Sequence, residues 1–255
     1  MKILISPAKK LNINNKNNCL VKSTKPSFLE KSQNIINILK KLSSEEISKL
    51  MNISKDLSQL NYNRNQSWNT SSSDKNANQA ILYFQGAVYE SMEIDKFNSE
   101  DFDFANNNLR ILSGLYGILK PSDMIMPYRL EMGTKIKINE HSNLYSFWKN
   151  SVTDNFINDS INDKSIINLA SNEYYKVIDS KKLSTPVITP VFKDVKKGKL
   201  KVISFYAKKA RGSMCNFIIK NKITDYNDLK NFNGLGYSFS NSESSKTLFT
   251  FTRSH

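Results

Sequence analysis

The spacing of apolar residues changes along this chain, and that change constrains the fold more than any other feature. Residues 29–42 carry leucine and isoleucine every three to four positions, which predicts a helix with one buried face. Residues 186–192 and 200–206 alternate apolar and polar residues on either side of a lysine-rich turn at residues 196–199, which predicts an antiparallel hairpin. We therefore expect an α/β (α+β) fold with a mixed sheet and packed helices, in one compact domain that spans residues 1–255.

Local signals place the ends of several elements. Serine followed three positions later by glutamate, as in Ser27 with Glu30 and Ser43 with Glu46, predicts two capped helix starts. Residues 61–78 are dense in asparagine and serine, so they predict a long loop. We also expect strands at residues 1–6, 165–170, 237–239 and 248–251, and further helix starts at Ser99 and Ser171.

The chain is strongly basic. Thirty-seven Lys and Arg residues stand against twenty-three Asp and Glu residues, which leaves a formal net charge of +14. Basic residues dominate between residues 164 and 211, whereas residues 90–103 are mainly acidic. A field of this sign attracts phosphate polymers and acidic surfaces, although an AT-rich genome would also inflate the lysine content. We expect a polyanionic partner, with DNA as the leading candidate.

Export, membrane insertion and metal binding find little support in the sequence. The apolar start at residues 3–5 is too short for a signal peptide, and runs such as residues 81–84 are far below the roughly 20 residues of a membrane span, so we expect a cytoplasmic protein that does not bind membranes. Cys19 and Cys215 form no C-x-x-C pair, which predicts buried, inert thiols. Besides these thiols, His141 and His255 are the only side chains that could supply nitrogen ligands of the kind that iron sites use, so we expect no metal site and no cofactor.

One glycine-rich segment offers a candidate site. Gly114 and Gly117 lie three residues apart and allow a sharp turn with close approach to a ligand, which Tyr116, Arg129 and Glu131 can surround. The alternative is purely structural: the glycines shape a turn, and Arg129 pairs with Glu131 or Asp123.

A second segment carries basic residues on a predicted helix. Residues 203–214 are expected to run from a strand into a helix whose apolar face includes Ala207, Ala210, Met214 and Phe217. Lys208 and Arg211 then lie one turn apart on an exposed face near the helix start, where N–H groups and the macrodipole favour anions. A solvated basic face is the alternative, but cations in a first turn oppose the dipole, which favours a bound phosphate.

Five motifs in the same order resemble those of the YaaA family of bacterial peroxide-stress resistance proteins, and they span nearly the whole chain. They are residues 5–9, residues 112–117 with Pro121 and Asp123, residues 127–133, residues 168–171 with Glu173 and Tyr174, and residues 204–212.

The resemblance implies a cytoplasmic protein that lowers unincorporated iron during hydrogen peroxide stress and so limits oxidative damage to DNA and protein. With no iron-storage pattern in the chain, the effect on iron is expected to be indirect. The resemblance also implies a fold peculiar to the family, with a positively charged cleft and a helix-hairpin-helix element that binds double-stranded DNA, whether intact, bulged or distorted. The expected DNA- or anion-binding residues are Lys9, Arg129, Lys208, Lys209 and Arg211, with Lys10 as a weaker candidate. The residues expected to shape turns and the cleft are Ser6, Ser113, Gly114, Tyr116, Gly117, Tyr128 and Gly212.

The location of a helix-hairpin-helix element stays open at this level. Residues 229–236 have the helix-then-turn spacing of such an element, whose backbone N–H groups contact phosphate without reading sequence, but the residues that follow alternate like a strand. Residues 112–120 carry glycines one position too far apart.

Three functions compete. The first is a DNA-binding protein. The second is an enzyme that acts on nucleic acid or a nucleotide, with Asp123, Glu131 or Glu173 as general acid, general base or metal ligand beside a basic wall. The third is an interaction protein whose basic surface contacts an acidic partner protein.

Overall fold

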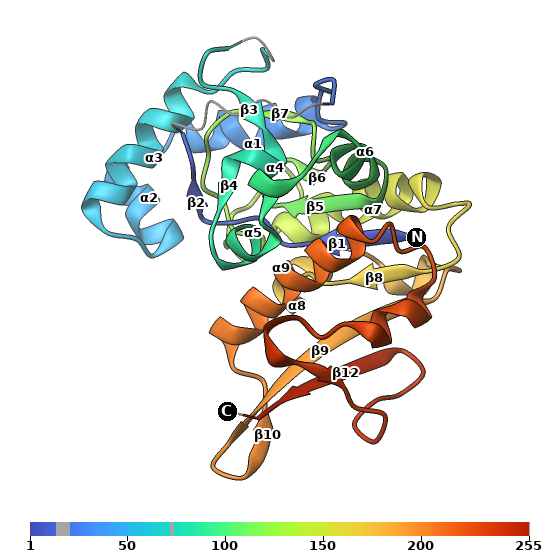
Figure 1. Ribbon diagram of the computed structural model, residues 1–255. Helices are drawn as coiled ribbons and strands as arrows, with labels where there is room; N and C mark the ends of the chain where they lie inside the picture. The colour runs from blue at the N-terminus through green and yellow to red at the C-terminus, as the bar shows by residue number, and fades with distance from the viewer. Residues whose placement is uncertain (14–20, 72–73, 255) are drawn as a thin grey trace.

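An eight-stranded mixed sheet forms the centre of the structure, a computed structural model that describes residues 1–13, 21–71 and 74–254 (Figure 1). The strand order is β11-β12-β9-β8-β1-β5-β6, and β10 pairs with β9. Strands β12, β9, β8, β1 and β5 run parallel, whereas β6, β10 and β11 are antiparallel to their neighbours. The strands are β1 (Lys2–Ile5), β5 (Leu109–Ser113), β6 (Gly117–Leu119), β8 (Ile166–Asn168), β9 (Val187–Lys196), β10 (Lys199–Lys201), β11 (Ser238–Phe239) and β12 (Leu248–Arg253). This is the mixed sheet that the apolar spacing predicts.

Strand β1 lies inside the sheet, between β8 and β5, and is buried along its whole length. Ile3, Leu4 and Ile5 of β1 have no exposed surface. A parallel strand covered on both faces reads as a continuous apolar run, which is the pattern at the start of this chain. The hydrophobic core is continuous from Met1 to Phe251, so helices from the first half of the chain and strands from its last third share one interior.

Helices and two small sheets cover the central sheet. Two-residue strands form the small sheets, with β2 (Lys10–Leu11) paired to β4 (Phe84–Gln85) and β3 (Asn78–Gln79) paired to β7 (Met124–Ile125). The helices are α1 (Leu29–Leu39), α2 (Ser44–Met51), α3 (Lys55–Ser67), α4 (Ala80–Tyr83), α5 (Ala87–Met92), α6 (Ser99–Asn108), α7 (Leu144–Asp159), α8 (Asn172–Tyr175) and α9 (Ser204–Lys220), with 3₁₀ turns at Ile94–Lys96, Ser180–Lys182, Tyr226–Asn231 and Gly234–Gly236. Helix α9 packs on α5, α6 and β9. None of the helices in the described part of the chain is long and apolar enough to cross a membrane.

Of the four predicted helix starts, two are right, one is wrong and one is displaced by one residue. Ser171 is the N-cap residue of α8, although its side chain makes no capping hydrogen bond. At α2 the Ser43 side chain accepts from the Glu46 N–H at 3.2 Å and the Glu46 carboxylate accepts from the Ser43 N–H at 2.8 Å, which confirms the capping box. The predicted box at Ser27 is wrong, because α1 begins after Phe28, whose ring packs on Trp148 and whose side chain makes no cap. Helix α6 is capped by Asn98, one residue before the predicted Ser99.

The loop predicted for residues 61–78 is wrong over its first seven positions, because α3 continues to Ser67. Asn61 and Asn65 lie buried on one face of this helix, and the Asn61 side chain donates to the Leu57 carbonyl at 2.7 Å. Tertiary packing has therefore overridden the weak helix propensity of asparagine.

The lysine-rich hairpin is confirmed by β9 and β10, but its second arm is shorter than predicted. β10 ends at Lys201 and α9 begins at Ser204, so Tyr206 is helical. The reason is the buried face formed by Ala207 and Ala210, which the sequence also indicated. On the same helix Cys215 is buried, and burial raises the pKa of its thiol far above the ordinary value. Cys19 and His255 lie outside the described residues.

An ionic contact fixes the far end of α9 and gives a test by pH. The Asp101 carboxylate accepts from Lys220 Nζ at 2.7 Å, from Lys222 Nζ, and from the Asn98 N–H at 3.1 Å. Burial alone would raise the pKa of Asp101, but these hydrogen bonds outweigh it and lower the pKa to about 2.

Because the pKa of Asp101 is lower in the folded protein than its value of about 4 in the unfolded chain, the ionised carboxylate stabilises the fold at pH values above about 4. This contribution disappears as the pH falls toward about 2. We expect Asp101→Asn to cost about 1–2 kcal/mol near neutral pH, since the lysine partners are partly solvated, and the difference from the parent to shrink between about pH 5 and pH 2. Urea unfolding at several pH values measures it. A difference that stays constant across this range would contradict the assignment.

Candidate functional site

The order in which strands are added to the sheet reverses between β1 and β8, which are themselves parallel. From β1 it crosses to β5 on one side, and it later returns to β8 and β9 on the other. In open α/β sheets ligands bind outside the carboxyl ends of the strands at such a point. The segments that follow β1 and β8 meet there: Ser6 Oγ accepts from the Ser171 N–H at 2.9 Å and donates to Ser171 Oγ at 3.2 Å. Tyr89 donates to the Ser6 carbonyl at 3.0 Å, so Ser6 joins three segments.

The glycine turn after β5 brings two backbones together. A Cβ on Gly114 would lie 2.3 Å from the Leu130 carbonyl oxygen, so only glycine lets residues 126–133 pass this close. Gly117 has a φ of +71°, and a Cβ there would meet Trp148 at 2.8 Å. The close approach that the sequence predicted is therefore made to protein backbone and to the core.

Buried tyrosines hold residues 126–133 in place. Tyr128 shares a 2.6 Å hydrogen bond with Ser113 Oγ and packs edge-on against Tyr116 with ring centroids 5.3 Å apart. Tyr116 OH accepts from Trp68 Nε1 at 2.9 Å and from the Met126 N–H at 3.0 Å. Burial raises the pKa of both tyrosines far above the ordinary range, so they act as neutral structural groups.

Arg129, Glu131 and Lys9 form a connected charged group at this edge. Arg129 Nη2 lies 3.1 Å from Glu131 Oε1, and Lys9 Nζ lies 2.6 Å from Glu131 Oε2. The Arg129 side chain is only 16 % exposed, whereas that of Lys9 is 60 % exposed. Arg129 Nε is buried and has no hydrogen-bond partner among the residues that the structure describes. The structure thus brings together three of the predicted site residues.

Glu131 and Glu173 face one open pocket of about 590 Å³. Glu173 Oε1 accepts from the Gly133 N–H at 3.0 Å, which ties α8 to the segment that follows Arg129. The lining residues are Lys49, Leu50, Met51, Asn52, Glu131, Gly133, Thr134, Lys135 and Glu173. The pocket therefore lies between the end of α2 and the carboxyl edge of the sheet, and it carries both signs of charge.

Asp123 does not belong to this group. It is 2 % exposed, accepts from the Lys120 N–H at 2.8 Å and from Thr24 Oγ1 at 2.6 Å, and lines a separate pocket together with Arg110 and Asp159. Burial raises the pKa of Asp123, although these hydrogen bonds oppose the shift. Its place in the fold is that of a turn-stabilising residue away from Glu131 and Glu173.

Arg64 is a residue that the sequence analysis missed. It lies on the part of α3 that was predicted as loop, it is half-buried, and its Nη1 donates to Asn61 Oδ1 at 3.3 Å. Burial lowers the pKa of Arg64, and the Arg129 guanidinium lowers it further against the opposing effect of Tyr83. No local signal could have revealed it, because residues 61–67 carry no apolar residues at helical spacing.

The other predicted basic residues lie on a separate surface. We call it the hairpin-helix surface and define it by six lysines on β9, the hairpin turn, β10 and α9: Lys196, Lys197, Lys199, Lys201, Lys208 and Lys209. All are exposed except Lys209, which is half-buried. Since Ile188 of β9 pairs with Ile167 near the end of β8, the hairpin extends past the β8 carboxyl end by roughly 23 Å. Figure 1 shows this hairpin beside the chain's C-terminus, away from the N-terminus.

The helix-start argument for Lys208 and Arg211 is wrong in its geometry. Because α9 begins at Ser204, Lys208 lies in its second turn and Arg211 beyond it, past the N–H groups that a helix start leaves free. Arg211 is half-buried instead of exposed, burial lowers its pKa, and it has no ion-pair partner among the described residues. Its neighbour Gly212 sits against α5, where a Cβ would lie 2.0 Å from the Val88 carbonyl oxygen. Lys10, on β2, is exposed.

Neither segment considered for a helix-hairpin-helix is a pair of helices. Residues 226–236 form two 3₁₀ turns followed by β11, and residues 112–120 form the β5-β6 hairpin. The structure does pair α2 with α3 across a short turn at residues 52–54, where Ser54 caps α3. The helix-hairpin-helix element stays a prediction. The helix pair α2 and α3 is the segment whose arrangement is most similar to such an element. Over the described ranges, no three His, Cys, Asp or Glu side chains gather in a group able to hold a metal ion.

Comparison with known proteins gives consistent matches over the whole length. The family model described as peroxide stress protein YaaA matches residues 1–243. A UPF0246 protein of Flavobacterium psychrophilum is 50 % identical over 255 residues, which cover 99 % of this chain and all of the relative. UPF0246 proteins of Saccharophagus degradans and Teredinibacter turnerae are 48 % and 46 % identical over 255 and 256 residues, with 99 % of both chains covered in each case.

Proposed function

The chain belongs to the YaaA family of peroxide stress proteins, and from that premise we propose that it limits oxidative damage by binding DNA through the hairpin-helix surface. In this proposal the protein acts in the cytoplasm, and unincorporated iron falls as an indirect consequence. Lys9, Lys10, Arg129 and Arg211 remain candidates for further phosphate contacts toward the expected basic cleft.

The charge of the hairpin-helix surface carries the proposal. Residues 195–211 contain seven lysines and arginines and no acidic residue. The nearest acid in the chain, Asp194, is fully buried and paired with Arg253. Within the described residues, none of the six lysines forms an ion pair with an acid, which leaves them for an external polyanion. Phosphate contacts of this kind supply most of non-specific DNA affinity.

An exposed aromatic ring lies among these lysines and favours DNA with unpaired bases. Phe205 is 57 % exposed, and Lys209 Nζ lies 4.9 Å from its ring centroid. Val202, 54 % exposed, adds apolar surface on the approach to α9. Unpaired bases stack on such rings, and cations beside the ring hold the backbone. This arrangement supports a preference for bulged or distorted DNA over intact duplex.

Salt dependence provides the test. We expect Lys201→Ala/Lys208→Ala to reduce the slope of log affinity against log salt by about 2, because each lost phosphate contact removes about 0.9 from the slope on duplex DNA. Fluorescence anisotropy across a salt series measures it. The matched control is Lys164→Ala/Lys182→Ala, which removes the same charge from exposed lysines ahead of β8 and β9 at the opposite edge. Equal slopes for the two double variants would place DNA elsewhere.

For the enzymatic alternative, Glu131 and Glu173 are the better candidates for catalytic carboxylates. These two carboxylates face the same pocket, whereas Asp123 lines a different one. Glu173→Gln is the cleaner probe, since Glu131 also neutralises Lys9 and Arg129. If DNA occupancy is sufficient, cells that carry Glu173→Gln survive peroxide as the parent does. Loss of protection with unchanged folding and DNA affinity would favour an enzyme.

A further inference from the structure

Basic side chains where α3 meets the carboxyl edge of the sheet have few carboxylate partners among the described residues. Arg129 and Lys9 share a single carboxylate, that of Glu131. Arg64 has no acidic partner among the described residues, and its one hydrogen bond goes to a neutral amide, Asn61 Oδ1. Partly buried guanidinium groups normally find anionic partners, because leaving water without one is unfavourable.

Packing of aromatic side chains brings the two arginines near each other. Trp68 follows α3 one turn after Arg64, and its Nε1 donates to Tyr116 OH at 2.9 Å. Tyr116 packs on Tyr128, and Arg129 is the next residue. Helix α3 and the Arg129 segment are thus fixed on the same buried ring system. Burial is the main cause of the lowered pKa of Arg64; Tyr83 opposes the shift, and the Arg129 guanidinium adds to it, so the field of Arg129 reaches Arg64.

Two donors in this region also lack an acceptor. Within the part of the chain that the structure describes, Arg129 Nε and Asn65 Nδ2 are both buried and make no hydrogen bond. Asn65 follows Arg64 on α3 and is 2 % exposed. A buried donor without an acceptor destabilises a fold, so native structures retain such groups where a ligand or water completes them.

We propose that Arg64 and Arg129 bind the phosphate group of a phosphate monoester. Planar guanidinium groups match the oxygens of a phosphate and can hold it with paired, charge-assisted hydrogen bonds. Lys9 keeps Glu131 paired, which limits repulsion between that carboxylate and the anion. The pocket of about 590 Å³ that begins at Glu131 offers room for the rest of the molecule.

This site is distinct from the hairpin-helix surface, and either can exist without the other. The monoester has two chemical sources: a free mononucleotide, or the 5′-phosphate at the end of a DNA strand. Both present a terminal dianionic phosphate, which the internal diesters of DNA lack.

Isothermal titration with inorganic phosphate tests the site first. We expect the parent to bind phosphate and Arg129→Gln and Arg64→Gln each to weaken that binding about 10-fold or more, the loss typical of a charge-assisted hydrogen bond. The matched control, Lys201→Ala/Lys208→Ala, should bind phosphate as the parent does. Equal weakening in this control, or no phosphate binding by the parent beyond that of chloride, would overturn the proposal.

Thermal unfolding separates binding from folding. Because the two guanidinium groups repel each other, Arg64→Gln should unfold at the same or a higher temperature than the parent without phosphate. Added phosphate should raise the melting temperature of the parent and leave that of Arg64→Gln nearly unchanged. An equal rise in both proteins would overturn the assignment.

Two further titrations identify the source of the phosphate. A nucleoside 5′-monophosphate that binds the parent more tightly than inorganic phosphate indicates a free nucleotide. A 5′-phosphorylated duplex that binds more tightly than its 5′-hydroxyl counterpart, with the difference abolished by Arg129→Gln, indicates a strand end. If neither difference is seen, the arginines do not form a monoester site.

Discussion

Replacement of Gly212 by alanine should destabilise the protein by about 3 kcal/mol or more, at the upper end of the range for added volume in a packed interior. An alanine Cβ at this position would lie 2.0 Å from the Val88 carbonyl oxygen and 2.8 Å from the Val88 carbonyl carbon. Both atoms are backbone, so no side-chain rotation relieves the contact. Helix α9 must then move away from α5, against which it packs most extensively.

Urea unfolding of Gly212→Ala and of a control, Gly133→Ala, measures this effect. A Cβ on Gly133 would approach only the end of the Glu173 side chain, at 3.2 Å, and that side chain can shift. We expect the control to lose less than about 1 kcal/mol, as conservative substitutions outside the core usually do. If both variants unfold at the parent's urea concentration, the close packing of α9 on α5 is not real.

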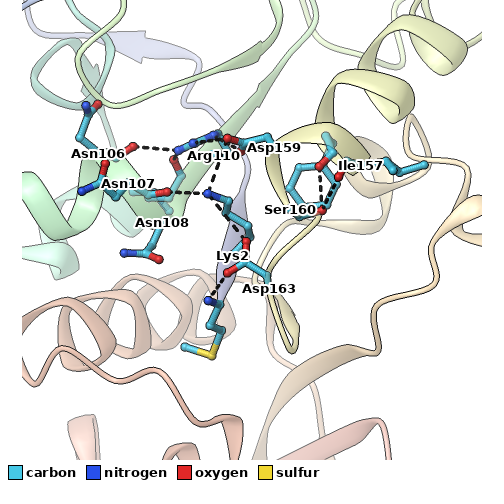
Figure 2. A network of polar contacts seen from close by, with 12 residues as sticks. Lys2, Asn106, Asn107, Asn108, Arg110, Ile157, Asp159, Ser160 and Asp163 are labelled. Atoms are coloured by element: carbon cyan, nitrogen blue, oxygen red, sulfur yellow. Dashed lines mark hydrogen bonds and ion pairs between the residues drawn. The ribbon is translucent and has the colours of Figure 1, made fainter.

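Removal of the Arg110 side chain should destabilise the protein to a comparable degree. Arg110 lies at the edge of the sheet where β1 and β5 begin, opposite the carboxyl edge that carries the candidate site. Arg110 Nε and Nη2 bond the two oxygens of Asp159 at 2.7 and 2.8 Å, and its Nη1 donates to the carbonyls of Asn106 and Leu109 at 2.9 and 2.7 Å. Figure 2 shows Lys2 beside this pair. Lys2 Nζ lies 3.6 Å from Asp159 and 3.8 Å from Asp163, and the amino group of Met1 also pairs with Asp163.

We expect Arg110→Leu to cost about 3–5 kcal/mol, because breaking a buried pair leaves its partner uncompensated. The lower end of this range applies, since Asp159 keeps a quarter of its side-chain surface in solvent and retains Lys2. Lys96→Ala is the comparison: it removes an ion pair to Glu93 whose two side chains are both largely exposed, and it should change stability by less than about 0.5 kcal/mol. Similar urea midpoints for the two variants would contradict a structural role for Arg110.

Much of the fold could be predicted from local patterns, for identifiable reasons. The buried run at residues 3–5 and the alternation from Val187 onward are direct records of burial on a sheet, so β1 and the β9-β10 hairpin were expected. The capping box at Ser43 involves residues three positions apart and is visible without tertiary structure. The predicted bounds of helices were wrong where contacts between residues far apart in the sequence determine the local structure. Phe28 docking on Trp148 sets the start of α1, and the buried face of Asn61 and Asn65 carries α3 through an asparagine-rich stretch.

The candidate site was only partly accessible to sequence reasoning. The grouping of Arg129 with Glu131 followed from their spacing, and motif matching contributed Lys9 and Glu173. The separation of Asp123 from these carboxylates depends on the turn that Thr24 and Lys120 close around it, which no local pattern reports. Arg64 escaped because a loop was expected, and the contact of Gly212 with α5 emerges only from the position of Val88.

The central claim, that DNA binds at the hairpin-helix surface, is tested most directly by site-specific photocrosslinking to a bulged duplex. A photoreactive residue is placed at Val202, which is exposed within this surface, or at Ile161, which is 73 % exposed at the end of α7 near the start of β8. We predict efficient crosslinking from position 202 that declines as salt is raised, and background crosslinking from position 161. Crosslinking from position 161 equal to or greater than that from position 202, with DNA bound in both samples, would contradict it.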